Sequence, residues 1–230
     1  MRKLVLLGTS GSGKTTFLKN LAGNAFNSKS EVTRNVEAEE FQQYNTFTPI
    51  DKSMFQDSTT TVSINTEPIL FYTTKTNEFG YQVLKSSNGQ LPRDDIDNLY
   101  PTIIYDPAGQ ERFSFMQEIG LKGADAVFIF ADGSNVQSIE RISHYVNMVQ
   151  EASETQGKGI SITIFVNKKD LESRGLFIGI DSVRRWIKDE SVLITPTSNL
   201  EPDTFNIPLR NLLDRLPGFP IPVEKVLVKA

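Results

Sequence analysis

Short runs of apolar residues recur along the chain, and each run ends at a glycine or a polar residue. Continuous apolar runs of this length are typical of parallel strands that are covered on both faces of a sheet. They predict strands at residues 4–7, 102–106, 126–132, 161–167 and 191–196.

Between these runs, apolar residues recur at intervals of three and four, which is the spacing of one face of a helix. The clearest stretch, 136–152, carries one apolar stripe made of Ile139, Ile142, Val146 and Val149. Strands that alternate with helices at this spacing imply right-handed crossovers and an open, mostly parallel sheet. Further helices are predicted at 14–21, 113–121, 181–188 and 204–213, the last with Thr204 as its N-cap.

The pattern is weaker in three stretches. Residues 23–60 are polar and only faintly periodic, which predicts an extended loop with one short helix at 36–44. Residues 61–84 predict one or two strands that form an antiparallel hairpin at the edge of the sheet, with its turn at 76–78. Residues 86–98 are rich in turn-forming residues and indicate an insertion.

The length of the chain, 230 residues, is sufficient for one substantial core. We therefore assign residues 1–216 to a single domain and residues 217–230 to a C-terminal tail. The tail is rich in proline and then apolar, so it either packs along the domain or serves as a docking segment, and packing is the favoured interpretation.

Composition narrows the class of protein. A net charge of −4 without a clustered basic stretch argues against nucleic acid as a partner. The chain has no cysteine, which excludes prenyl and palmitoyl anchors, and no apolar run approaches the ~20 residues of a membrane helix. We expect a cytoplasmic protein that contacts membranes only through partners.

The segment GTSGSGKTT, residues 8–16, joins the first predicted strand to the first predicted helix. Glycines let the backbone curl around phosphates with its amides pointing inward, and the helix N-terminus adds positive potential. In this pattern Lys14 would bridge the outer phosphates, and the hydroxyl of Thr15 would bind Mg²⁺. The predicted phosphate-binding residues are Gly8, Ser10, Gly11, Ser12, Gly13, Lys14, Thr15 and Thr16.

A second motif, DPAGQ, begins at the end of the strand predicted at 102–106. A carboxylate there, Asp106, is placed to bind the metal directly or through water. The amide of Gly109 could then meet a terminal phosphate, and Gln110 could orient a water for in-line attack. An isolated Asp-x-x-Gly is most often a simple turn, so this motif gains its meaning from the first one.

A third motif, NKKD, follows the strand predicted at 161–167 and places Asn167 and Asp170 at the same rim of the sheet. A carboxylate at Asp170 can accept hydrogen bonds from both N1–H and the exocyclic amine of guanine, whereas adenine presents an acceptor at N1. The stem of Lys168 could cover one face of the base. Alone, the motif would be read as a solvated turn; third in this series, it predicts GTP over ATP.

The ordered set GTSGSGKT, DPAGQ and NKKD resembles the Ras-like small GTPases over residues 1 to about 215. The segments STTTVSI and PAGQERFSFMQEIGLKGADAVFIFAD are most similar to the prokaryotic branch, which contains MglA-like and archaeal proteins. The resemblance implies an α/β P-loop NTPase fold, with a six-stranded, mostly parallel sheet, one antiparallel edge strand and flanking helices. It also implies GTPase-activating proteins, exchange factors and effectors as partners.

The resemblance further implies a threonine that binds Mg²⁺ and senses the γ-phosphate. Thr59, Thr60 and Thr61 stand together, and Thr61, directly before the VSI strand, is favoured. With Lys14 and Gln110 it would complete the catalytic set. The usual Ser-Ala-Lys base-contact motif is replaced by TPTSN, residues 195–199, with Thr197 and Ser198 as the nearest candidates. Ser10 and the long interval from Lys14 to Thr61 also depart from the family.

These motifs predict a regulatory GTPase that binds GTP or GDP with Mg²⁺ and hydrolyses GTP slowly without a partner. Two alternatives remain open. One is a GTP-bound scaffold with little or no turnover. The other is an ATP-dependent kinase or ATPase, for which NKKD would be accidental.

Overall fold

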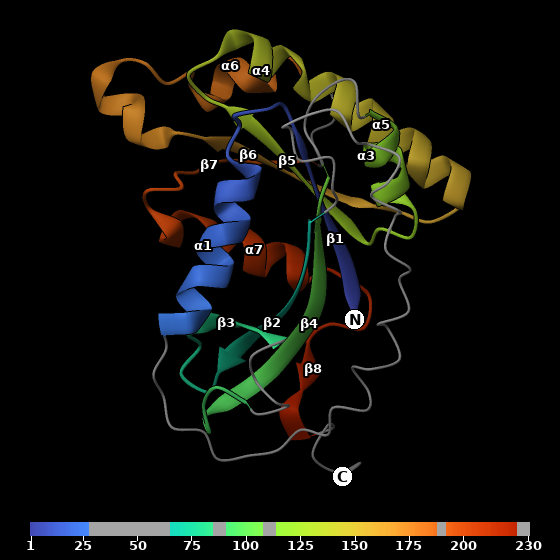
Figure 1. Ribbon diagram of the computed structural model, residues 1–230, viewed down its shortest axis with the longest axis vertical. Coiled ribbons are helices and arrows are strands. Elements are labelled where there is room, and N and C mark those ends of the chain that lie inside the picture. The colour runs from blue at the N-terminus through green and yellow to red at the C-terminus, as the bar shows by residue number, and fades with distance from the viewer. Residues whose placement is uncertain (28–64, 85–90, 108–113, 188–191, 225–230) are drawn as a thin grey trace, which may run out of the picture.

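The computed structural model describes residues 1–27, 65–84, 91–107, 114–187 and 192–224 (Figure 1). The strands are β1 (Arg2–Gly8), β2 (Asn65–Thr74), β3 (Phe79–Val83), β4 (Ile96–Asp106), β5 (Ala126–Asp132), β6 (Ser161–Asn167), β7 (Leu193–Pro196) and β8 (Ile221–Pro222). The α-helices are α1 (Lys14–Asn27), α3 (Ser114–Leu121), α4 (Val136–Glu140), α5 (Ile142–Gln156), α6 (Ile180–Arg184) and α7 (Asn206–Leu213), with 3₁₀ helices η4 (Lys169–Arg174) and η5 (Pro202–Phe205).

One eight-stranded sheet runs in the order β3-β2-β4-β1-β5-β6-β7, and β8 pairs with β4. The pairs β4–β1, β1–β5, β5–β6 and β6–β7 are parallel. Each apolar run of the sequence contributes to one of these strands, so the mostly parallel α/β fold is confirmed. Because the strands are parallel, the carboxyl ends of β1, β4 and β6 share one rim of the sheet.

The sheet is larger than the resemblance implies. The hairpin supplies two strands, so the antiparallel β2 is second from the edge and β3 is outermost. The chain reverses at Asn77, whose φ is 68° and whose N–H donates to the carbonyl of Thr74 at 2.8 Å. At β4, residues Asn98 and Leu99 lie before the stretch that pairs with β1, and β8 pairs with them there.

The apolar stripe of the longest predicted helix is buried, but the helix is interrupted. Arg141 separates α4 from α5, and its N–H reaches back to the carbonyls of Gln137 and Ile139.

The prediction of Thr204 as a helix N-cap is wrong. A 3₁₀ turn begins earlier, at Pro202, and the hydroxyl of Thr204 instead donates to the carbonyl of Glu201 at 2.7 Å.

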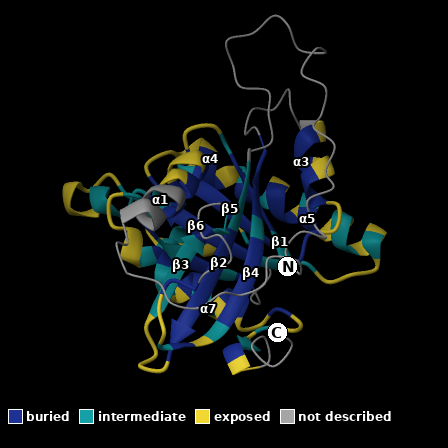
Figure 2. Ribbon diagram, turned by 60° about the horizontal axis from the view of Figure 1, so that its bottom comes forward, coloured by how far each residue is buried: buried dark blue, intermediate teal, exposed yellow. Residues whose placement is uncertain are grey.

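The core lies on both faces of the sheet, and alternate residues of β1 point to opposite sides. Leu4 and Leu6 pack in the cluster that includes α1 and α7, whereas Val5 and Leu7 pack in the cluster that includes α3, α4 and α5. Figure 1 shows these two groups of helices apart from each other, and Figure 2 shows the central strands β1, β4 and β5 buried over most of their length. Burial on both faces explains why β1 is a continuous apolar run.

A smaller apolar cluster lies where the neighbouring strands β2 and β4 meet the C-terminal tail. It contains Leu70, Leu99 and Val223, so the beginning of the C-terminal tail packs along the sheet. No helix among the described ranges has the length and apolar character needed to span a membrane.

Candidate functional site

The loop between β1 and α1 passes very close to the ends of other strands. A Cβ atom at Gly8 would lie 2.1 Å from the carbonyl oxygen of Phe130 in β5. At Gly13, where φ is +102°, it would lie 2.1 Å from Nδ2 of Asn167 and 2.4 Å from Nδ2 of Asn199. Only glycine fits at these two places, and the reason is packing against β5 and the end of β6 as well as backbone conformation.

The predicted phosphate-binding residues divide by exposure. Ser10, Gly11, Thr15 and Thr16 are exposed, whereas Ser12 and Lys14 are buried. The hydroxyl of Ser12 donates to the carbonyl of Thr9 at 2.9 Å, so this side chain braces the loop from within. A ligand in front of the loop would therefore meet the backbone of Ser12 and not its hydroxyl.

Lys14 is folded back into the loop. Its Nζ donates to the carbonyls of Gly8 and Thr9, at 2.8 Å each, and the residue is 5% exposed. Burial lowers the pKa of Lys14 to about 8 from an ordinary value of 10.5, while the Asp106 carboxylate acts in the opposite direction. A buried ammonium held by carbonyl dipoles would be stabilised by an anion placed against the loop.

Thr15 and Asp106 bring two oxygen ligands together at the same rim. The hydroxyl of Thr15, in the first turn of α1, donates to Oδ2 of Asp106 at 2.7 Å, and Asp106 is the last residue of β4. Hydroxyl and carboxylate oxygens suit Mg²⁺, which usually keeps several waters and needs few protein ligands. The pair is therefore the candidate metal site, and the described ranges hold no cluster of three or more His, Cys, Asp or Glu side chains.

The NKKD residues lie at the carboxyl end of β6. The Nδ2 of Asn167 donates to the carbonyl of Ser12 at 3.0 Å, which joins this motif directly to the phosphate-binding loop. The hydroxyl of Ser198 donates to Oδ1 of Asp170 at 2.6 Å. This bond orients the Asp170 carboxylate, as an acceptor for two donors on a base would require.

Lys168 takes a left-handed conformation, with φ 72°, and its Nζ forms an ion pair with Oδ2 of Asp132 at 2.5 Å. Burial acts to raise the pKa of Asp132, but the hydrogen bonds from Lys168 and Ser134 outweigh it and lower the pKa. The carboxylate therefore stays charged and fixes the direction of the lysine stem.

Thr197 is fully buried and acts through its backbone. Its N–H donates to the carbonyl of Val166 at 2.9 Å, and its carbonyl accepts the N–H of Lys169 at 2.9 Å. Thr197 thus holds the segment after β7 against the NKKD turn, where Ser198 meets Asp170.

Three residues that the sequence motifs did not single out belong to this arrangement. Nδ2 of Asn199 donates to the carbonyl of Gly13 at 3.0 Å, and the Nδ2 of Asn20 donates to the carbonyl of Asn199 at 2.9 Å. Ser138 in α4 lies 2.7 Å from the hydroxyl of Thr9 and accepts the N–H of Asp132 at 2.9 Å. Asn199 could have been suspected from the sequence, because it directly follows Ser198. Nothing in the sequence around Asn20 or Ser138 indicates that these residues would contact the site.

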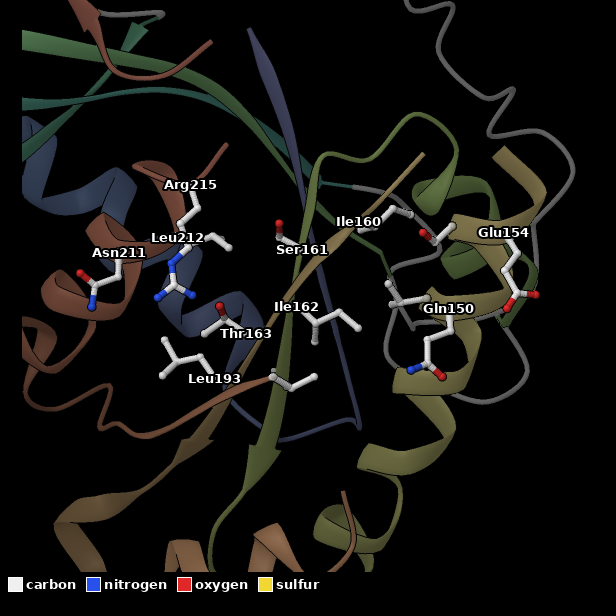
Figure 3. A pocket seen from close by; sticks show the side chains of 13 residues that line it. Gln150, Glu154, Ile160, Ser161, Ile162, Thr163, Leu193, Asn211, Leu212 and Arg215 are labelled. Atoms are coloured by element: carbon white, nitrogen blue, oxygen red, sulfur yellow. The ribbon is translucent and has the colours of Figure 1, made fainter. Parts of the chain in front are cut away.

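A groove of about 550 Å³ lies elsewhere, between α5, β6 and α7. Figure 3 shows Asn211 of α7 and Arg215, just beyond the end of that helix, on one side of β6 and Gln150 and Glu154 of α5 on the other. From β6 the groove is lined by Ser161, Ile162 and Thr163, which begin the strand, whereas Asn167 ends it. The groove is therefore at the opposite end of the strand from the predicted site.

The structure brings together Lys14, Thr15, Asp106, Asn167 and Asp170 along one rim of the sheet, through the contacts given above. Gly109, Gln110 and Thr61 lie outside the described residues.

Comparison with known proteins agrees with this architecture. The sequence model of the Ras family matches residues 92–213, which run from the segment before β4 to the end of α7. The Ras-related protein RabZ of Dictyostelium discoideum is 25% identical over 97 residues, which cover 42% of this chain and 41% of that relative. Neither match distinguishes the prokaryotic branch from other small GTPases. Because the family match spans more than half of its residues, the chain belongs to the Ras family.

Proposed function

We propose that the chain is a guanine-nucleotide switch that binds GTP and GDP with Mg²⁺ and hydrolyses GTP slowly. The observation that carries this proposal is the direct hydrogen bond from Asn167 of the NKKD motif to Ser12 of the phosphate-binding loop, 155 residues apart. This contact joins the NKKD motif, which carries Asp170, to the loop that would bind the phosphates. Membership of the Ras family supports the same class of activity.

Base selection falls to Asp170. Its carboxylate is oriented by Ser198 and has remaining lone pairs for two parallel N–H donors. Guanine presents such a pair at N1 and the exocyclic amine. Lys168, held by Asp132, would place its methylene stem along one face of the base.

Phosphate binding falls to the loop amides and Lys14, which would give up the carbonyls of Gly8 and Thr9 for phosphate oxygens. Thr15, Asp106 and, by resemblance, Thr61 would hold Mg²⁺, which neutralises charge on the phosphates when bound. The pairing of Thr15 with Asp106 supports this assignment, because the two oxygens already face each other.

For hydrolysis we assign Gln110 to orient the attacking water and Gly109 to sense the γ-phosphate. The sequence places no arginine close to Thr61, so a partner would supply a cation or hold Gln110 in place. GTP would order the segments near Thr61 and Gly109, and hydrolysis would release them, which changes the binding of effectors. A cytoplasmic protein of the MglA-like branch, regulated by activating and exchange factors, is consistent with these features.

The first test is the identity of the nucleotide that the chain binds. Denaturing the purified chain should release GDP or GTP, and unlabelled GTP should displace a fluorescent GDP at least 100-fold better than ATP, because adenine would oppose the Asp170 carboxylate. Equal displacement by ATP would favour a kinase or ATPase and refute the proposal.

Turnover is measured on the same preparation. Single-turnover hydrolysis of GTP should be slow, in the range of ~10⁻⁴ to 10⁻² s⁻¹ that Ras-like proteins show without a partner, and slower still in Gln110→Leu. If Gln110→Leu and the unaltered chain behave alike, a scaffold without turnover becomes the better interpretation.

The pKa of Lys14 gives the affinity for GDP a pH dependence. The pKa of this lysine is about 8 in the free chain, and bound phosphates would favour its charged form. Above about pH 8 the lysine is mostly neutral in the free chain, so binding of GDP takes up a proton. The affinity should therefore fall as the pH rises, by about four-fold between pH 7 and 8.5.

Lys3 provides a control for this measurement. Burial lowers its pKa to about 8 as well, but it lies at the opposite end of β1 from the loop. In Lys3→Met the pH dependence of GDP binding should persist unchanged. A flat profile in the unaltered chain would show that Lys14 does not gain a phosphate partner.

A further inference from the structure

The phosphate-binding loop is held from behind by two asparagine side chains. Nδ2 of Asn167 donates to the carbonyl of Ser12, and Nδ2 of Asn199 donates to the carbonyl of Gly13, each at 3.0 Å. The carbonyl of Gly13 also accepts the N–H of Phe17 at 2.9 Å, which is the first hydrogen bond of α1. Two consecutive peptide units of the loop are thus fixed by groups outside it.

Because each peptide unit is planar, these two hydrogen bonds also set the direction of the N–H groups on the opposite side of the loop. In a trans peptide the C=O of one residue and the N–H of the next point in opposite directions. Holding the carbonyls of Ser12 and Gly13 toward the asparagines therefore directs the N–H groups of Gly13 and Lys14 away from them. That side is where the phosphates would lie.

Asn199 is itself held from two further elements. Its N–H donates to Oδ1 of Asn167 at 3.1 Å, and its carbonyl accepts Nδ2 of Asn20 in α1 at 2.9 Å. The bond from Nδ2 to the carbonyl of Gly13 sets how the side-chain amide of Asn199 is turned, because a reversed amide would place its oxygen against that carbonyl. Asn199 thus connects the base-contact segment, α1 and the loop.

We propose that Asn199 is a positioning residue that holds the Gly13 peptide in the orientation needed to bind the outer phosphates of a guanine nucleotide. This inference rests on the proposed function. If Ser198 stands for the serine of the family motif Ser-Ala-Lys, Asn199 takes the place of its alanine, which has no amide to make this bond. The chain thereby gains a direct connection between its base end and its phosphate end.

The test compares GDP with GMP, which lacks the outer phosphate, in competition with a fluorescent GDP on the full chain. Asn199→Ala should weaken GDP binding about five-fold, as expected for the loss of one hydrogen bond. It should leave GMP binding within about two-fold. Asn199→Asp should weaken GDP binding further, because a carboxylate would oppose the carbonyl of Gly13 and add a negative charge behind the loop.

Asn206→Ala is the matched control, since Nδ2 of Asn206 donates to Oδ1 of Asp203 at 3.1 Å on the exposed side of α7. It should bind both nucleotides as the unaltered chain does, and thermal melting establishes that each variant is folded. Equal weakening of GDP and GMP by Asn199→Ala, or no weakening at all, would overturn the positioning role. Failure of the unaltered chain to bind GDP would instead refute the proposed function.

Discussion

Asp170→Asn is expected to shift the preference of the site from guanine to xanthine nucleotides by at least roughly 100-fold. The carboxylate offers acceptors only, which suits the two N–H donors of guanine. An amide offers one acceptor and one donor, which suits the N1–H and the C2 carbonyl of xanthine. With GDP, the amide NH₂ would face the exocyclic amine, so a buried donor on each side would be left without a partner.

The surrounding hydrogen bonds should keep the variant side chain in place. The hydroxyl of Ser198 donates to Oδ1 of Asp170, and it can make the same bond to the amide oxygen of an asparagine. The substitution therefore tests recognition of the base with the fold unchanged. Competition between GDP and XDP for the site gives the measurement.

Asp203→Asn is the control for this change, because Asp203 also accepts one side-chain hydrogen bond, from Asn206, but lies in an exposed turn. It should retain the preference for GDP. If Asp170→Asn lost GDP without gaining XDP, the carboxylate would have a structural role, and the choice of base would lie elsewhere.

Much of the fold could be predicted because its causes are local. The runs at Leu4–Leu7 and Ala126–Asp132 are apolar at nearly every position, since both faces of these strands are covered, and the structure makes each a central strand. The glycines of the phosphate-binding loop were recognisable for a similar reason. Part of their requirement is local, because Gly8 and Gly13 both have positive φ, although contacts with Phe130, Asn167 and Asn199 add to it.

The hydrogen bonds that hold the site together were harder to predict from the sequence, because they join distant parts of the chain. Asn199 and Gly13 are 186 residues apart, and no periodicity relates them. The pairing of β8 with β4 depends on the short length of β1, which leaves the beginning of β4 open for the tail. Thr204 was predicted as an N-cap because its hydroxyl can accept a backbone N–H. It does accept the N–H of Ser198, but this N–H does not belong to the first turn of a helix.

Gly13→Ala is expected to lower the free energy of unfolding of the nucleotide-free chain by about 3 kcal/mol, of which about 1 kcal/mol is the strain of a side chain at positive φ. The remainder arises because the new methyl group would overlap Nδ2 of both Asn167 and Asn199. Each amide would have to leave a carbonyl of the loop, at about 1 kcal/mol for each hydrogen bond lost.

Gly11→Ala separates the two causes, since Gly11 lies in the same loop with φ +78° but has no atom within 4 Å of the added Cβ position. It should cost about 1 kcal/mol, or about 2–4 °C in the melting temperature of a chain of this size, against about 6–12 °C for Gly13→Ala. Thermal unfolding followed by circular dichroism, without nucleotide, measures both. Equal shifts would mean that the asparagines do not clamp the loop, because the methyl group at residue 13 would then displace nothing that stabilises the fold.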